Sequence, residues 1–347
     1  MLFRSVRDGR IVLTGGEVGL AGEMTASRAI DVRGETITVE SQLDVKTDTS
    51  FSLRADGDVV FNDNAHVEAL TPRGADDLKV EVILRADADA NGTGTVVFDS
   101  DVQLTLDGAH AHIFYNPEDP DGDGPGHRYE NPTDFTGHVA GEDHTAYMLV
   151  NDVHDLQAIT KKLDGNYALG QGIDASDTEH WKDDDGVTRG FAPIGSPAGS
   201  FTGIFDGQGH VIEGLNINRP DESDVGLFGA IGAGGVVRRV GMKNVEVTGD
   251  AGVGGLVGTN DGTVTQSYST GGVTGHRDVG GLVGANRGTV TQSSANSTVT
   301  GSADNSEAIG GLVGLNAAGT IRQSYATGAV SGHRYVGGLV GYNRVFG

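Results

Sequence analysis

A five-residue block, Gly-Gly-Leu-Val-Gly, recurs four times in the last hundred residues of this 347-residue chain. The copies begin at Gly254, Gly280, Gly310 and Gly337, and a looser copy, Val-Gly-Leu-Phe-Gly, begins at Val225. The leucines of successive blocks stand between 26 and 30 residues apart. A period of this length is typical of stacked repeats, in which each unit buries its apolar face against its neighbours. The repeat therefore predicts a solenoid.

Two further blocks recur between these copies. Gly-Thr-Val-Thr-Gln-Ser begins at Gly262 and at Gly288, a variant of it begins at Gly319, and each unit closes on Val-Thr-Gly or Val-Ser-Gly. Three strand-sized pieces joined by Gly and Asn corners predict one coil of a triangular parallel β-helix. The block residues that we expect to hold the coils together are Gly226, Leu227, Gly229, Gly255, Leu256, Gly258, Gly281, Leu282, Gly284, Gly311, Leu312, Gly314, Gly338, Leu339 and Gly341.

Stacked coils align equivalent residues in columns. Amide side chains in such a column hydrogen-bond to one another along the stack. We expect one internal amide ladder from Asn260, Asn286, Asn316 and Asn343. We expect a second ladder from Gln266, Gln292 and Gln323. Internal stacking is also the simpler interpretation of Tyr268 and Tyr325, which follow these glutamines.

The first hundred residues also read as short strands. From about Gly15 to Tyr115, runs that alternate apolar and polar residues are separated by Gly, Asn and Asp, which is the strand and turn pattern. The convincing helix lies at about 152–163, where Val153, Leu156, Ile159 and Leu163 form one apolar stripe. The predicted fold class is therefore all-β, a right-handed parallel β-helix with one short peripheral helix.

Charge and composition exclude several classes of partner. Forty-eight acidic and 24 basic residues give a net charge of −24, which disfavours nucleic acid and anionic membranes. No cysteine is present, so disulfides and thiolate metal sites are excluded. No apolar run is long enough to span a membrane, and the first residues lack the apolar core of a signal peptide. Both ends look cut, so we expect an internal piece of a longer protein.

An acidic loop offers the sharpest metal-binding pattern. Asp119, Asp121 and Asp123 alternate before Gly124, and Glu130 stands where an EF-hand loop has its closing bidentate ligand. Calcium is the ion that such hard oxygens prefer. A solvated polar loop is the alternative interpretation, because flanking helices are lacking and glycine occupies the position of the usual apolar residue. Calcium is thus a candidate cofactor.

Other polar clusters are weaker candidates. Asp183, Asp184 and Asp185 are more readily a solvated loop than a cation site, since consecutive carboxylates point in different directions. His110 and His112 share one face of a predicted strand, as a two-histidine metal site or as an ordinary surface pair. A polysaccharide-active enzyme would need paired carboxylates. The carboxylates available for such a pair are Asp174, Asp206, Glu213 and Asp250.

The Gly-Leu-Val-Gly cores resemble the GLUG motif, a repeat of extracellular bacterial proteins. The middle of the chain is similar to filamentous-haemagglutinin-like exoproteins of two-partner secretion systems. This similarity rests on Ala146-Tyr-Met-Leu-Val-Asn-Asp-Val, Gly165-Asn-Tyr-Ala-Leu, Phe191-Ala-Pro-Ile-Gly and Phe201-Thr-Gly-Ile-Phe-Asp-Gly-Gln-Gly-His. The resemblance implies a right-handed β-helix, export through an outer-membrane pore partner, and a host-cell or glycan receptor.

These observations predict four segments. Residues 1–116 form haemagglutinin-like β-helix rungs, 117–145 an acidic Gly/Pro-rich loop, 146–220 a connecting segment with the helix, and 221–347 the GLUG repeats. We expect a non-catalytic segment of a secreted or surface-displayed bacterial adhesin, acting in adhesion and as a rigid stalk. The alternatives are a structural or calcium-dependent spacer in a larger exoprotein and a polysaccharide-active β-helix enzyme.

Overall fold

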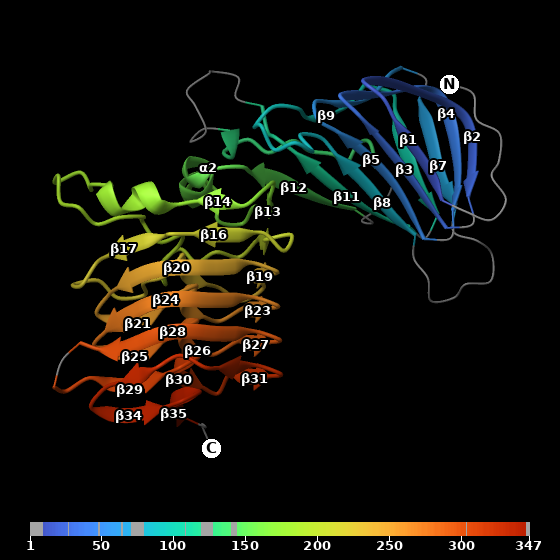
Figure 1. The fold of residues 1–347 in the computed structure, drawn as a ribbon. Helices are drawn as coiled ribbons and strands as arrows, with labels where there is room; N and C mark the ends of the chain where they lie inside the picture. The colour runs from blue at the N-terminus through green and yellow to red at the C-terminus, as the bar shows by residue number, and fades with distance from the viewer. Residues whose placement is uncertain are drawn as a thin grey trace. The chain divides into compact units, whose positions relative to one another are not determined.

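The chain is all-β and divides into two compact units (Figure 1). The first unit comprises residues 1–124 and 130–149, and the second comprises residues 125–129 and 150–347. The computed structural model describes residues 10–26, 28–47, 49–63, 65–70, 80–107, 109–118, 128–139, 144–302 and 304–344.

The first unit is built from two parallel sheets. One sheet has the order β1 (Ile11–Thr14), β3 (Ala29–Gly34), β5 (Ser50–Ala55), β8 (Glu81–Arg85), β11 (His110–Tyr115) and β12 (His144–Val150). The other has the order β10 (Gln103–Asp107), β7 (His66–Leu70), β4 (Thr36–Thr47), β6 (Val59–Phe61) and β9 (Val96–Phe98), with β2 (Glu17–Ala26) also paired to β4.

The core of the first unit follows from alternation along these strands. Successive side chains point to opposite faces of a sheet, and parallel pairing places residues of the same face in columns. Ile30 of β3 lies beside Phe51 of β5, and Phe51 lies beside Val82 of β8; all three side chains are fully buried. The next residue along each strand, Asp31 after Ile30 and Ser52 after Phe51, points to the opposite face of the sheet.

The second unit stacks the repeats. In its described residues the strands of successive coils stack into four parallel series, of which the longest have six strands in line and the shortest has four. The first contains β13 (Tyr167–Leu169), β15 (Ile204–Asp206), β19 (Val236–Arg238), β23 (Thr263–Thr265), β27 (Thr289–Thr291) and β31 (Thr320–Arg322). The second contains β14 (Ile173–Asp174), β16 (Val211–Glu213), β20 (Gly241–Thr248), β24 (Tyr268–Gly275), β28 (Ser294–Gly301) and β32 (Tyr325–Ala326), with β17 (Asn216–Asn218) on β20 and β33 (Val330–Ser331) on β28.

The other two sheets hold the glycine block. One contains β18 (Phe228–Ile231), β22 (Val257–Asn260), β26 (Val283–Asn286), β30 (Val313–Ala317) and β35 (Val340–Arg344). The other contains β21 (Ala251–Gly254), β25 (Arg277–Gly280), β29 (Glu307–Gly310) and β34 (Arg334–Gly337). The block therefore ends one strand and begins the next, with Gly-Leu at the corner between them. We expected the glycine block to lie in one of three strands of a coil. That expectation is wrong, because the Gly-Leu corner divides the block between two strands.

Consecutive repeats pair in register, apart from one irregularity between β20 and β24 at Met242 to Val245. Val257 lies beside Val283, Val283 beside Val313, and Val313 beside Val340. The block leucines Leu227, Leu256, Leu282 and Leu312 are fully buried, whereas Leu339 of the last coil is 39% exposed. Each coil therefore covers the apolar corner of the coil before it.

Two corners of each coil turn through left-handed backbone. At one corner the residues with positive φ are Gln208, Arg239, Gln266, Gln292 and Gln323. At the other they are Asp224, Gly252, Asp278, Ala308 and Tyr335. A left-handed residue other than glycine costs roughly 1–2 kcal/mol. The same cost recurs in coil after coil, so stacking of the strands must outweigh it.

The predicted helix is shorter than its apolar stripe. The α-helix α2 spans Val153–Ala158 and continues as a 3₁₀ turn over Ile159–Lys161. The side chain of Asp152 caps α2 by accepting hydrogen bonds from the backbone N–H groups of His154 and Asp155. Leu156 and Ile159 are fully buried. The helical segment therefore ends at Lys161, two residues before the expected end at about 163, because Lys162 has a non-helical backbone.

The glycine at the second position of the block predicts where a side chain cannot be tolerated. A Cβ on Gly281 would clash with the carbonyl oxygen of Gly311 in the next coil, but a Cβ on Gly338 would meet nothing within 4 Å. We expect Gly281→Ala to lower the free energy of unfolding by about 3 kcal/mol, the cost of forced overpacking. Gly338→Ala, the same substitution in the last coil, is the control, with a cost below about 1 kcal/mol. Urea unfolding of both variants tests this, and equal losses would contradict it.

Candidate functional site

The asparagines of the repeats form a continuous column inside the second unit. The Nδ2 group of Asn260 donates to Oδ1 of Asn286 at 2.8 Å, and Asn286 donates likewise to Asn316 at 2.8 Å. Asn316 donates to Oδ1 of Asn343 at 2.9 Å. Asn260 and Asn286 are fully buried. Each amide therefore joins two coils through groups that would be costly to leave unpaired.

The glutamines do not form a second internal ladder. Gln266, Gln292 and Gln323 are exposed, and their left-handed backbone turns the chain at the end of each strand. The buried column is formed by the following serines instead. The backbone N–H of Ser267 donates to Oγ of Ser293 at 3.2 Å, and that of Ser293 donates to Oγ of Ser324 at 3.2 Å. The recurrence of the Gln-Ser dipeptide correctly indicated an internal column, but the buried residue of the pair is the serine.

Removal of one amide from the middle of the column should be costly. We expect Asn286→Ala to lower the free energy of unfolding by about 3 kcal/mol, because it removes both ladder hydrogen bonds and takes from Asn260 and Asn316 their amide partner in the column. Asn343→Ala, at the exposed end of the column, should cost below about 1 kcal/mol.

Chemical denaturation of the two variants, with Gln292→Ala as a surface control, measures the difference. A loss in Gln292→Ala as large as that in Asn286→Ala would contradict the assignment of the internal column.

Asp206 is the most deeply buried carboxylate of the second unit's candidates. It is 0% exposed and accepts hydrogen bonds from Nε of Arg238 at 2.9 Å, from Nε of Arg239 at 3.0 Å and from the backbone N–H of Gln208 at 2.9 Å. Nη2 of Arg239 is a further donor. Burial alone would raise the pKa of Asp206, but the hydrogen bond from Arg239, the Gln208 N–H and the charges of both arginines together lower it. This geometry joins β15 to the corner that follows β19.

The lowered pKa predicts how this ion cluster responds to acid. Because the folded-state pKa of Asp206 lies below the ordinary value of 3.8, the carboxylate stabilises the fold above pH 3.8, and that stabilisation is lost as the pH falls through the folded value. We expect Asp206→Asn to cost about 3 kcal/mol near pH 7. The difference from the parent should shrink as the pH falls below 3.8. Denaturation of both proteins across this pH range checks the sign, and a difference that grows in acid would contradict it.

The other carboxylates considered for an enzyme have separate partners. Glu213 pairs with Lys243 at 2.9 Å, Asp250 lies 3.4 Å from Nδ1 of His276, and Asp174 accepts from the backbone N–H of Ser176 at 3.0 Å. Asp206 and Glu213 end strands of different sheets. The structure thus does not bring these four carboxylates into one described cluster.

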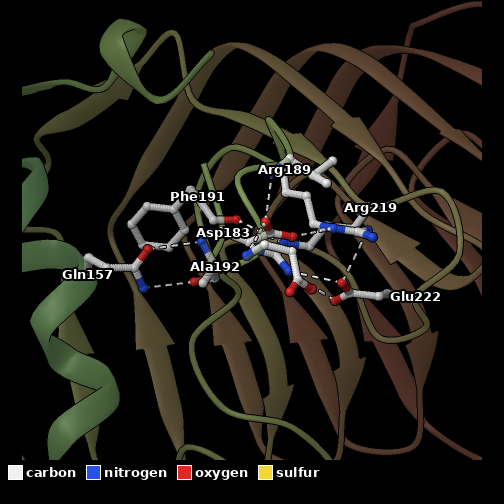
Figure 2. A network of polar contacts seen from close by, with 9 residues as sticks. Gln157, Asp183, Arg189, Phe191, Ala192, Arg219 and Glu222 are labelled. Carbon is white, nitrogen blue, oxygen red and sulfur yellow. Dashed lines mark hydrogen bonds and ion pairs between the residues drawn. The ribbon is translucent and has the colours of Figure 1, made fainter. Parts of the chain in front are cut away.

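A polar network ties α2 to two loops of the second unit (Figure 2). The side-chain amide of Gln157 donates to the carbonyl of Ala192 and accepts from its N–H, both at 2.9 Å. Asp183 accepts from Nε of Arg189 at 2.8 Å, and Glu222 accepts from Arg219 at 3.0 Å. Asp183 also accepts from backbone N–H groups of its own loop. The first aspartate of the acidic triplet therefore organises a loop.

The two histidines of β11 do lie on one face. Their ring centroids are 4.8 Å apart. Nε2 of His112 is 2.7 Å from Oε2 of Glu81, and Nε2 of His110 is 3.1 Å from Oγ1 of Thr145. Among the described residues, no group of three or more His, Asp or Glu side chains is placed to hold a metal ion. In the acidic loop, Asp119, Asp121 and Asp123 lie outside the described residues, and Glu130 is exposed.

Aromatic side chains lie on the outside of the coils. Tyr268 is 37% exposed and Tyr325 is 62% exposed, so internal stacking is wrong for both. Tyr335 stacks on Tyr342 with ring centroids 4.7 Å apart, and the guanidinium of Arg334 lies 5.1 Å from the centre of the Tyr335 ring. Side chains of these types dominate binding surfaces. Tyr268 and Tyr325, which share one outward position of the coils, are the groups with which the coils could contact a partner.

Comparison with known proteins identifies the repeat. Residues 305–331 match the GLUG motif. Halomucin from Haloquadratum walsbyi is 39% identical over 128 residues, which is 35% of this chain and 1% of that protein. A protein of Evansella cellulosilytica named as a Gly-rich membrane protein is 40% identical over 78 residues, which is 22% of this chain and 9% of that protein. No solved structure matches the chain.

The comparisons cover small parts of much longer relatives, since the chain spans 1% and 9% of their lengths. In the part of the chain that the structure describes, no helix is long and apolar enough to cross a membrane. The haemagglutinin-like portion of the resemblance and the secretion route stay predictions. What is established is an all-β chain that contains a GLUG motif within in-register repeats.

Proposed function

We propose that this chain is a non-catalytic segment of a secreted or surface-displayed bacterial exoprotein, in which a right-handed parallel β-helix acts as a rigid stalk and presents adhesive side chains. The observation that carries the proposal is the unshifted pairing of consecutive repeats from β22 onward in all four sheets of the second unit. Such an arrangement has no internal limit to its length, because each repeat contacts only its neighbours.

Rigidity follows from what lies inside the coils. The asparagine column runs from Asn260 to Asn343 and the serine column from Ser267 to Ser324, and the block leucines fill the corner between two sheets. Bending the stack would break several buried hydrogen bonds at once. A spacer built this way holds its ends apart with little conformational freedom, which is the property that a stalk requires.

The names of the relatives support a surface location for the proposal. One is named halomucin and the other a Gly-rich membrane protein, and both are far longer than the stretch that this chain matches. Export through an outer-membrane pore partner and recognition of a host-cell or glycan receptor belong to the proposal through the resemblance. The exposed Tyr268 and Tyr325 are the aromatic groups best placed for such a contact.

The stalk role predicts linear growth. Four extra copies of residues 254–279, inserted after Val279, should lengthen the particle by about 19 Å, since paired strands lie about 4.8 Å apart. Small-angle X-ray scattering measures the maximum dimension, and thermal unfolding shows whether the added coils stack. Growth in all three dimensions, as in a globular domain of increasing length, would contradict the stalk.

The adhesive role needs a separate experiment. The purified chain should bind cells or a glycan array, and the binding should be compared in calcium and in chelator. If the acidic loop holds calcium, calcium should raise the melting temperature of the parent and not that of Asp121→Ala. Absence of binding in both conditions would contradict the adhesive role and would not affect the stalk role. An unchanged melting temperature in the parent would remove calcium from it.

A further inference from the structure

Three arginines stand side by side on the outer face of the first unit. In the sheet register Arg33 of β3 lies beside Arg54 of β5, and Arg54 lies beside Arg85 of β8. The neighbouring positions on each strand point inward and are fully buried, as for Val32 and Leu53. Like charges directly opposite one another destabilise a sheet. Their alignment is notable in a chain whose net charge is −24.

One carboxylate serves most of this column. Asp31, 3% exposed, lies 2.6 Å from Nη2 of Arg10 and 2.9 Å from Nη2 of Arg33, and it accepts from Oγ of Ser52 at 2.8 Å. It lies only 3.9 Å from Nε of Arg54, a distance too long for a hydrogen bond. The Nε atom of Arg54 is buried without a hydrogen-bond partner. Asp31 is therefore shared among more cations than it can neutralise.

Arg85, the third arginine of the column, lies beside an aromatic ring and is not part of the exposed group. Arg85 is 9% exposed, and its guanidinium lies 5.4 Å from the centre of the Phe114 ring. Burial and the charge of Arg54 lower the pKa of Arg85, and Asp87 acts in the opposite direction. Glu81, on the same strand, is 2.7 Å from His112. Among the described residues, Arg10, Arg33 and Arg54 thus share the single carboxylate of Asp31.

The guanidinium groups around Asp31 are accessible to solvent. The side chains of Arg10 and Arg33 are 54% and 56% exposed, and that of Arg54 is 39% exposed. Guanidinium groups offer planar forks of N–H donors that match carboxylate and sulfate oxygens. Neighbouring strands lie about 4.8 Å apart, so Arg33 and Arg54 can face two acidic groups spaced on that scale.

We propose that Arg10, Arg33 and Arg54 form an oxyanion-binding site for an acidic polysaccharide that carries carboxylate or sulfate groups. The glycan would supply the negative charge that Asp31 alone does not. A sugar chain with one acidic group per residue presents its charges on the length scale of the strands. This site lies in the first unit and does not depend on the stalk role proposed for the repeats.

Binding measurements on the full chain test the site. Polygalacturonate supplies carboxylates, dextran sulfate supplies sulfates, and neutral dextran is the uncharged control. We expect at least one acidic probe to bind with an affinity that falls as salt is added, and neutral dextran not to bind. Arg54→Gln and Arg33→Gln should each weaken that binding about tenfold, the effect of a lost charge-assisted hydrogen bond.

Matched variants separate a site from general charge. Arg287→Gln removes the same charge from the second unit, where Arg287 pairs with Asp261 at 3.4 Å, and should leave binding unchanged. Arg54→Lys keeps the charge but loses the fork, so it should bind more weakly than the parent and more tightly than Arg54→Gln. Circular dichroism and melting temperature report folding, and the highly exposed Arg33 provides the variant least able to disturb it.

Three results would overturn the proposal. They are absence of binding by both acidic probes, equal binding by the parent and both glutamine variants, or an equal loss in Arg287→Gln. A preference for polygalacturonate would assign the ligand as a carboxylate glycan, and a preference for dextran sulfate would assign it as a sulfated one.

Discussion

In-register parallel pairing between successive coils is the constraint on which the second unit depends. Each strand forms its backbone hydrogen bonds with the equivalent strand one repeat away, so Val264 faces Val290 and Val290 faces Ile321. A slip by one residue would turn every buried side chain outward. The left-handed corners at Gln266 and Gln292 are tolerated because they return the chain to that register in each coil. The unshifted register thus determines which residues can share a column.

A column places copies of one side chain next to each other, so their mutual attraction or repulsion recurs in every coil. Inside the coils, asparagine is favourable because its amide donates to one neighbour and accepts from the other, as Asn286 does. A residue able only to donate would repel its own copies in the same position. Arg33, Arg54 and Arg85 are such a column, and it lies on an outer face where solvent or a ligand can reach part of it. The same stacking rule therefore stabilises the core and concentrates charge on the surface.

The sequence period was enough to predict an all-β repeat chain, and the identity of the repeated residues placed Asn260 and its equivalents in one column. The period could not show which of two adjacent corner residues has its side chain buried. Gln266 recurs as faithfully as Asn260, yet its left-handed backbone directs it outward and leaves Ser267 inside. Nor could it show that Gly281 divides two strands, because the reason is contact with the next coil, which is remote in sequence. Asp31 and its arginines were missed because their strands share no repeated motif, and only the register brings them together.

The distribution of variation among the coils indicates where specificity resides. Positions that face inward keep their residue or its shape, as with Leu256, Leu282 and Leu312. Outward positions within a strand can change, since Tyr268 is beside Ser294 and Ser294 is beside Tyr325, whereas the outward glutamines of the corners are kept. Because the register fixes the backbone, these substitutions alter the surface without altering the stack. A chain built this way can diversify its contacts coil by coil, while the buried columns keep every coil interchangeable in its fold.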